Sequence, residues 1–209
     1  VRSSAASDVY KRQGRDVEFG GDHRCGAGGE ACRCVRIAGE IVVLLSRCGR
    51  AARSATKPPS KAMFVRIAAG AVAGIDAVTV SVEVNVAAAG QLGLFLVGLP
   101  DNAVKESEQR IRAAFENSGE RMAGKKVVVS LAPADLRKEG AGFDLPIAVG
   151  ILAAMGRIDA GAVAGTMFVG ELSLDGSLKP VRGVLPVAVR ARSEGLRRVV
   201  LPAENAAEA

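Results

Sequence analysis

From residue 63 onward, apolar and polar side chains repeat with periods that are typical of strands and helices. Residues 78–86 (VTVSVEVNV) alternate apolar and polar positions, which predicts a half-buried strand. Shorter β-type runs predict further strands at 64–68, 94–98, 126–132 and 197–202. Residues 167–178 predict a strand pair in which Asp175-Gly176 forms the turn.

Three segments predict helices. In 102–118 an apolar stripe of Val104, Ile111 and Phe115 lies opposite charged positions, with Asp101 as the expected N-cap and Gly119 as the expected end.

The second predicted helix follows Asp144, which we expect to cap it, and its apolar side chains on all sides predict a central position. A third helix is predicted over about 183–194. Together these elements predict an α/β domain, of the α+β two-layer kind.

The chain has two parts of unlike composition that meet at Met63. Residues 1–62 hold twelve basic and six acidic residues, whereas 63–209 hold sixteen of each, so the whole net charge of +6 lies before Met63. The basic pI therefore does not indicate a broad nucleic-acid surface on the organised part. No apolar run approaches the roughly 20 residues that span a bilayer, so no membrane partner is expected.

Residues 1–62 show no sustained helix or strand period, and we expect them to be disordered. Residues 3–13 (SSAASDVYKRQ) can be back-translated into what looks like a transposon-end adapter used to build sequencing libraries. We interpret 1–62 as adapter and upstream read-through into a gene that starts at Met63, and exclude it from fold reasoning.

A zinc site and a basic nucleic-acid tail are the rival interpretations of this segment. His23, Cys25, Cys32, Cys34 and Cys48 are zinc-ligand types, but the single residue between Cys32 and Cys34 rarely lets both thiolates face one ion. We therefore expect no metal site.

Familiar catalytic motifs are weak in the organised part. Residues 119–126 (GERMAGKK) match a phosphate loop except that Lys126 replaces the Ser or Thr, and here a helix ends and a strand begins, which is the reverse of the required order. Residues 63–209 contain no His and no Cys, which excludes His-based triads and Cys nucleophiles. A Ser–Lys pair stays open, and Ser177 near Lys179 is its best candidate.

The stretch 131–146 (LAPADLRKEGAGFDLP) is the densest group of charges in the organised part. It could be an active site or only a corner between strand and central helix, and we favour the corner. Arg137, Lys138 and Glu139 would then be solvated charges, with contact to a neighbouring subunit, an ATPase module or DNA as the alternative.

Four long blocks in 63–209 resemble the N-terminal domain of the ComM/YifB family of bacterial magnesium-chelatase-like AAA+ ATPases. They are VGLPDNAVKESEQRIRAAFENSG, LAPADLRKEGAGFDLPIAVGILAAMG, GELSLDGSLKPVRGVLP and LPAENAAEA. The resemblance implies a Lon-protease-like domain of the ribosomal protein S5 domain 2-like fold. It also implies that the chain stops before an AAA+ module that would hold ATP and magnesium, with no cofactor in this fragment.

The resemblance to Lon peptidases supplies a sharp test for catalysis. Laying KEGAGFD on the Lon serine turn places Gly142 at the serine, and laying PVRGVL on the later lysine segment places Leu185 at the lysine. Without a hydroxyl and an amine at these positions the peptidase mechanism has neither nucleophile nor base. The expected catalytic set is therefore empty.

The function implied by the resemblance is a non-catalytic accessory domain of a cytoplasmic bacterial ATPase. The family is linked to branch migration of DNA in natural transformation. The implied partners are the protein's own AAA+ module, other subunits of a homo-oligomeric ring (a hexamer) and, in the complete protein, DNA. Two alternatives remain: a Lon-like serine peptidase with the displaced pair Ser177 and Lys179, and a RadA-like recombination scaffold.

Overall fold

The computed structural model describes two sets of residues. Backbone and side chains are described for 64–87, 93–98, 101–120, 125–135, 138 and 140–209. Before them, backbone alone is described for four strands, β1 (Val17–Glu18), β2 (His23–Arg24), β3 (Ala31–Ile37) and β4 (Ile41–Leu45).

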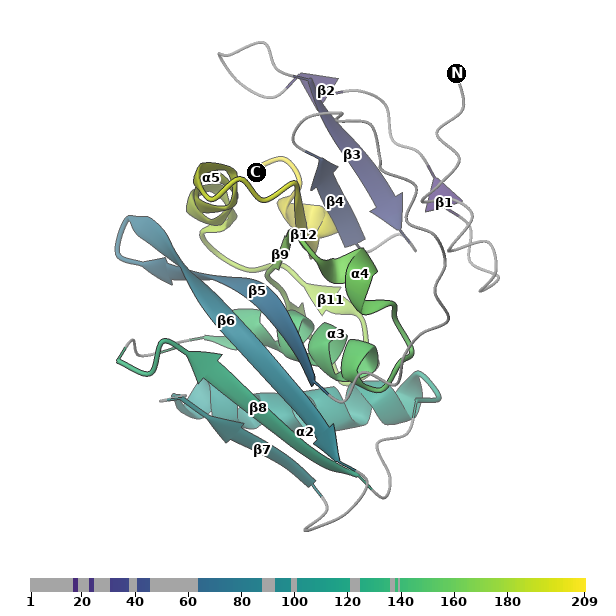
Figure 1. Cartoon of the computed structure of the whole chain (residues 1–209). Coiled ribbons are helices and arrows are strands. Elements are labelled where there is room, and N and C mark those ends of the chain that lie inside the picture. Colours follow the sequence, from purple (N-terminus) through teal and green to yellow (C-terminus); the bar gives the residue numbers. More distant parts are fainter. Residues whose placement is uncertain are drawn as a thin grey trace.

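A mixed sheet forms the centre of the molecule (Figure 1). Its strands in the organised part are β5 (Phe64–Ala73), β6 (Asp76–Ala87), β7 (Gly93–Val97), β8 (Lys126–Ala132), β9 (Thr166–Phe168) and β12 (Arg198–Pro202). The order is β12-β9-β5-β6-β8-β7, and β4, β3 and β1 continue it beyond β12. β9 is parallel to both of its neighbours and β7 is parallel to β8, whereas β5, β6 and β8 pair antiparallel.

Helices, 3₁₀ turns and a small second sheet complete the described part of the chain. The helices are α2 (Asn102–Asn117), α3 (Asp144–Ala154), α4 (Ala160–Val163) and α5 (Val184–Ser193), with 3₁₀ turns η2 (Ala141–Phe143) and η3 (Ala203–Asn205). β10 (Glu171–Leu172) and β11 (Leu178–Lys179) form a separate two-stranded sheet.

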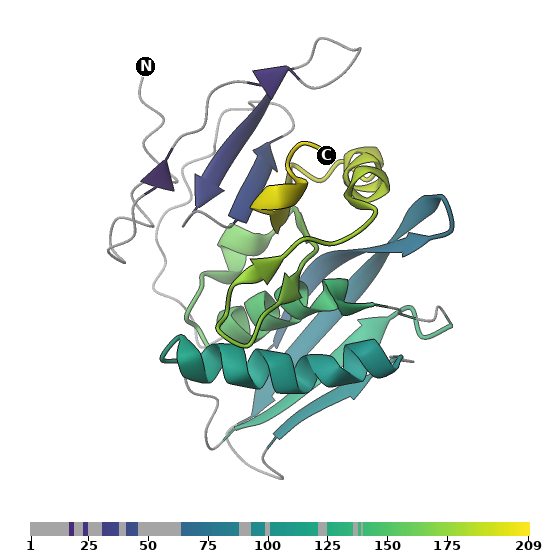
Figure 2. The same cartoon turned by 180° about the vertical axis from the view of Figure 1, so that it is seen from behind.

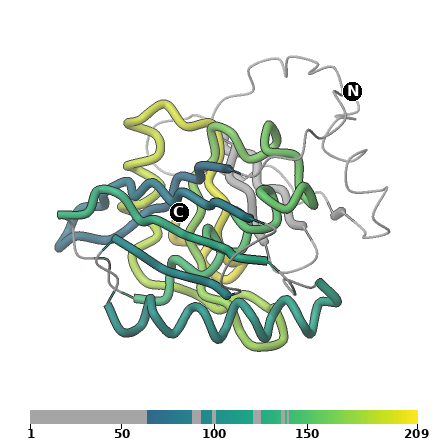
Figure 3. The backbone as a smooth tube through the Cα atoms, turned by 60° about the horizontal axis from the view of Figure 1, so that its bottom comes forward, coloured from purple at the N-terminus to yellow at the C-terminus, as the bar shows by residue number. Residues whose placement is uncertain are grey.

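Helices α2 and α3 cover one face of the sheet, as the view from behind in Figure 2 and the tilted tube in Figure 3 show. The period-2 alternation of the strands explains this, because Val80, Val82 and Val84 on β6 all point into the cluster that contains α3. α5 packs on the opposite face, where Gly70 of β5 lies against Val187. Successive residues of β5 therefore face two different apolar clusters, one beneath α3 and one beneath α5.

The predicted α/β class is confirmed, and each predicted strand and helix of 63–209 has a counterpart within a few residues. The two-layer arrangement describes the sheet with α2 and α3, and α5 adds a helix on the other face. The pair predicted in 167–178 is the β10–β11 hairpin, while β9 joins the central sheet instead.

The predicted signals at both ends of α2 are confirmed. Asp101 is the N-cap, and its carboxylate accepts a hydrogen bond from the Val104 amide at 2.7 Å. At the other end the amides of Gly119 and Glu120 bind the carbonyls of Glu116 and Phe115, which is the Schellman pattern.

The predictions for residues 1–62 lie largely outside the described residues. Strands β1 to β4 fall inside the segment that we expected to be disordered, and β4 pairs antiparallel with β12. The side chains of the zinc candidates His23, Cys25, Cys32, Cys34 and Cys48 are outside the described part of the chain, so that interpretation is not tested here. Among the described residues, no helix combines the length and the apolar character that crossing a membrane requires.

Candidate functional site

The most connected polar group of the described chain is the carboxylate of Asp144, at the start of α3. It is fully buried and accepts hydrogen bonds from two other elements, α2 and β10. Arg110 of α2 binds it with two nitrogens, Nε to Oδ2 at 2.6 Å and Nη2 to Oδ1 at 3.0 Å. The Ser107 hydroxyl donates to Oδ1, and the Leu172 amide of β10 donates to Oδ2 at 3.1 Å. We call Ser107, Arg110, Asp144 and the Leu172 amide the Asp144 cluster.

The prediction that Asp144 caps α3 is wrong. Asp144 is itself the first residue of α3, the N-cap position belongs to Phe143, and no side chain caps that end. The carboxylate points instead at Arg110, which lies 34 positions earlier in the sequence. A guanidinium that binds both carboxylate oxygens is a stronger partner than a single backbone amide, so the long-range pair determines where the side chain lies.

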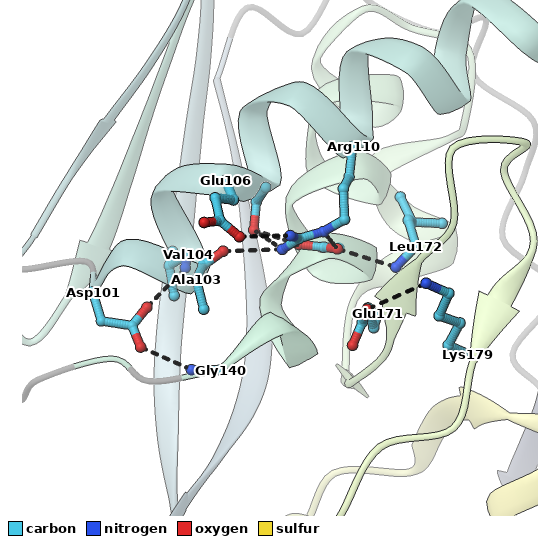
Figure 4. Close-up of polar contacts among 11 residues, drawn as sticks. Asp101, Ala103, Val104, Glu106, Arg110, Gly140, Glu171, Leu172 and Lys179 are labelled. Atoms are coloured by element: carbon cyan, nitrogen blue, oxygen red, sulfur yellow. Dashed lines mark hydrogen bonds and ion pairs between the residues drawn. The ribbon is translucent and has the colours of Figure 1, made fainter.

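The charges of the Asp144 cluster compensate each other. The hydrogen bond to Asp144 raises the pKa of Arg110 above its ordinary value, although burial opposes this. Arg110 also donates to the carbonyl of Ala103 at 3.0 Å and lies 3.6 Å from Glu106, whose side chain is largely exposed (Figure 4). The cluster thus holds a complete ion pair at the join of α2, α3 and β10.

This arrangement favours a structural role over catalysis. The described contacts of Asp144 satisfy both oxygens, and Arg110 is engaged on two of its nitrogens by the same carboxylate. A general base needs an available lone pair, and an electrophile needs a free N–H aimed at a substrate. The cluster is best interpreted as a structural link that holds α2, α3 and β10 together.

Lys138 is the second unexpected group, and the prediction that it is a solvated charge is wrong. Its side chain is fully buried, and its Nζ donates to the carbonyl of Pro133. Its own carbonyl accepts from the Asp101 amide at 3.1 Å, and the Gly140 amide donates to the Asp101 carboxylate at 3.2 Å (Figure 4). The loop is therefore folded onto the N-terminus of α2. Arg137 and Glu139 lie outside the described residues.

Burial of Lys138 predicts a dependence of stability on pH. Burial lowers the pKa of Lys138 below its ordinary 10.5, and Asp135 opposes this only in part. Between the lowered folded pKa and 10.5 the unfolded chain binds more protons, so the free energy of unfolding should rise with pH across this window. Lys138→Met should lose that rise. Urea midpoints of both proteins at neutral pH and at about pH 10 measure it.

The exposed Lys179→Met variant is the matched control for this experiment. Its urea midpoint should stay at a constant offset from the parent protein between the two pH values. A constant offset for Lys138→Met as well would contradict the assignment of Lys138 as a buried amine.

The two positions that the resemblance to Lon peptidases singled out, Gly142 and Leu185, carry no hydroxyl and no amine. Gly142 lies in η2, where its carbonyl accepts from the Gly170 amide at 3.0 Å. Leu185 lies in the first turn of α5 and is half exposed. A side chain on Gly142 would face Val169, which belongs to the cluster beneath α5, whereas Leu185 is not part of that cluster.

The displaced pair Ser177 and Lys179 is not brought together by any described hydrogen bond. The Ser177 hydroxyl donates to Asp175 at 2.7 Å, within the turn of the β10–β11 hairpin. Lys179 lies 3.7 Å from Glu171, and 55% of its side chain is exposed, so its amine is not desolvated (Figure 4). A serine in a turn and a solvated lysine do not form a nucleophile with its base.

The segment that resembles a phosphate loop has the predicted order of elements. In the described residues α2 ends at Asn117 and β8 begins at Lys126, so the segment leads from a helix to a strand, the reverse of the order that a phosphate loop requires. Residues 121–124 lie outside the described part. Within the described residues, no group of three or more His, Cys, Asp or Glu side chains has the arrangement of a metal site.

Sequence reasoning missed the Asp144 cluster, although one signal for it was present. Ser107 follows Val104 by three positions on the stripe of α2 that faces the core, and it is fully buried. A polar residue on an apolar stripe needs a buried partner. That requirement points to a buried polar group without identifying Asp144.

Comparisons with known proteins agree with the resemblance seen in the sequence. Residues 82–205 match the family model described as subunit ChlI of Mg-chelatase. The chain is 45% identical over 136 residues to competence protein ComM of Haemophilus influenzae, which covers 65% of this chain and 26% of that protein. It is 44% identical over 135 residues to YifB of Salmonella typhimurium, with the same two shares, and 42% identical over 132 residues to YifB of Escherichia coli, covering 63% of this chain and 26% of that protein. The chain thus spans about a quarter of the length of these relatives.

Proposed function

This chain belongs to the ComM/YifB family of proteins with a ChlI-like domain, and on that premise we propose that it is a non-catalytic accessory domain of a longer ATPase. The observation that carries the proposal is the chemistry of the two dyad positions. Gly142 offers no hydroxyl and Leu185 offers no amine. The Lon-like identity of the domain is itself part of the proposal, since those positions come from the resemblance.

Two further findings support an accessory role. The match covers 26% of competence protein ComM, which leaves most of such a protein to other modules. The Asp144 cluster joins α2, α3 and β10, and both carboxylate oxygens of Asp144 accept hydrogen bonds within it. A rigid domain of this kind suits assembly or substrate engagement, with ATP and magnesium bound in the remaining module.

We extend the proposal to DNA, because one relative is named a competence protein. In this extension the complete protein is a ring of identical subunits that moves DNA branches, and the present domain contributes to assembly or to engagement of the strands. A three-stranded branch-migration assay on the complete protein, with and without residues 63–209, tests the extension. Undiminished branch migration without the domain would contradict it.

Activity measurements on the chain and on the complete protein test the accessory role. The chain alone should not cleave casein, because Ser177 and Lys179 form no nucleophile–base pair. It should show no magnesium-dependent ATP turnover, because residues 119–126 lack the Ser or Thr and the order of elements that a phosphate loop requires. The complete protein should turn over ATP. Purified parent chain and its Ser177→Ala variant are compared in both assays.

Each outcome has a distinct meaning. ATP turnover by the chain alone would contradict the accessory role. Cleavage of casein that disappears in Ser177→Ala would establish the peptidase alternative instead. Cleavage that persists in Ser177→Ala and co-purifies with the chain would also contradict the accessory role, with a nucleophile other than Ser177.

A further inference from the structure

Helix α5 has two apolar faces, and only one of them is covered. Val184, Val187 and Ala191 point into the cluster beneath the helix and are buried. Leu185 and Val189, one helical turn apart, are 51% and 60% exposed on the outward side. A helix at the edge of a domain usually presents polar side chains on that side, so these two residues are unusual.

The hairpin between β5 and β6 brings further exposed apolar side chains to the same region. It extends past the helices on the side where α5 lies (Figure 1). Val72 is 48% exposed, and Gly183 at the start of α5 packs so closely on it that an added Cβ would lie 2.5 Å from Val72 Cγ2. Ile75 at the hairpin turn is 93% exposed. We call Val72, Ile75, Leu185 and Val189 the α5 face.

The last residues of the chain lie beside helix α5. The Glu208 carboxylate accepts from the Val184 amide at 3.0 Å, at the N-terminus of α5. Asn205 binds both the carbonyl and the amide of Val181, at 2.8 and 2.9 Å. Ala209 packs against the cluster beneath α5, and both views place the C-terminus next to this helix (Figures 1 and 2).

We propose that the α5 face is the docking surface for the module that follows Ala209 in the complete protein. The inference rests on the proposed function, in which this chain is one part of a longer protein, as the matched region is 26% of competence protein ComM. A polypeptide that leaves beside α5 is tethered close to the α5 face, and a tether raises the effective concentration of what it carries. Several exposed large apolar side chains on neighbouring elements, here α5 and the β5–β6 hairpin, are a mark of an interaction surface.

The chemistry of the occupant follows from that of the face. Leu185 and Val189 require aliphatic or aromatic side chains opposite them, and the exposed Arg182 beside Leu185 favours an acidic group at the rim. The other exposed large apolar residues lie on other elements: Phe64 at the start of β5, Val97 on β7 and Leu174 in the β10–β11 turn. They provide internal controls.

Thiol labelling of single-cysteine substitutions tests the proposal. Val189→Cys and Leu174→Cys are made in the 1–209 chain and in the complete protein; the two parent side chains are 60% and 59% exposed. Maleimide modification of each residue is followed by peptide mass spectrometry, so that the four natural cysteines do not interfere. We expect the complete protein to slow labelling at position 189 by roughly tenfold or more and to leave position 174 unchanged.

The alternatives give different patterns. Equal rates at position 189 in the chain and in the complete protein overturn the docking, as does equal slowing at positions 189 and 174. Slow labelling of Val189→Cys in the 1–209 chain that speeds up on dilution assigns the face to a second copy of the chain and also overturns it. Leu185→Cys repeats the measurement on the same face.

ATP turnover of the same complete protein separates this inference from the one on which it rests. Absence of turnover with slow labelling at position 189 removes the proposed function and keeps the docking. Turnover with unchanged labelling removes the docking and keeps the proposed function.

Discussion

Replacing Asp144 by alanine should lower the free energy of unfolding by about 3–5 kcal/mol. The substitution removes the carboxylate that neutralises Arg110, whose side chain is only 16% exposed, and leaves that guanidinium with an uncompensated charge at the join of three elements. It also removes the acceptor for the buried Ser107 hydroxyl and for the Leu172 amide. Urea unfolding followed by circular dichroism gives the change.

The exposed pair of Arg66 and Glu83 provides the control. Arg66 Nη2 lies 2.8 Å from Glu83 Oε1. Glu83→Gln should nevertheless lower the free energy of unfolding by less than about 1 kcal/mol, because water screens the charges. The double variant Asp144→Ala with Arg110→Met should be more stable than Asp144→Ala alone, since no charge is left unpaired. If Asp144→Ala lowered the free energy of unfolding by less than about 1 kcal/mol, the Asp144 cluster would contribute little to the stability of the fold.

Gly98→Ala should be the second severe substitution, costing about 3 kcal/mol or more. A Cβ on Gly98 would lie 2.2 Å from the carbonyl oxygen of Leu131, and backbone of the neighbouring strand β8 cannot move aside as a side chain can. The φ of Gly98 is +101°, a conformation that side chains rarely adopt. We expect β7 to detach from the sheet, and hydrogen exchange of its amides measures this directly.

Gly74→Ala isolates the contribution of backbone conformation. Gly74 has a φ of +65° in the β5–β6 turn, but no atom lies within 4 Å of an added Cβ. Its cost should be only about 1–2 kcal/mol, with β7 exchange unchanged. Equal losses for Gly98→Ala and Gly74→Ala would mean that the contact with Leu131 contributes nothing.

Elements that depend on neighbouring residues could be predicted from the sequence. Strand β8 spans Lys126–Ala132 as predicted, because its apolar run is bounded by charge on one side and proline on the other. Asp101 was identified as the N-cap of α2, since capping involves an amide only three residues away. In both cases the residues that determine the element are close together in the sequence.

Residues with distant partners could not be predicted in this way. Asp144 has the sequence position of an N-cap, and nothing near it shows that Arg110 will bind its carboxylate. Lys138 has charged neighbours in the sequence, so its burial against Pro133 contradicts the usual behaviour of a polar turn. The fold was predicted from periodicity, whereas the polar contacts of the candidate site depend on how the elements pack.

Strand β9 restricts the order in which the protein can assemble during synthesis. It is three residues long and lies between β5 and β12, with Met167 opposite Ala68 on one side and Val199 on the other. The β5–β6 hairpin can form as soon as it leaves the ribosome, because its strands are joined by a tight turn. The outer edge of β5 can pair with β9 only after residues 166–168 have been synthesised. Until then the nascent chain exposes an unpaired strand edge, which favours chaperone binding.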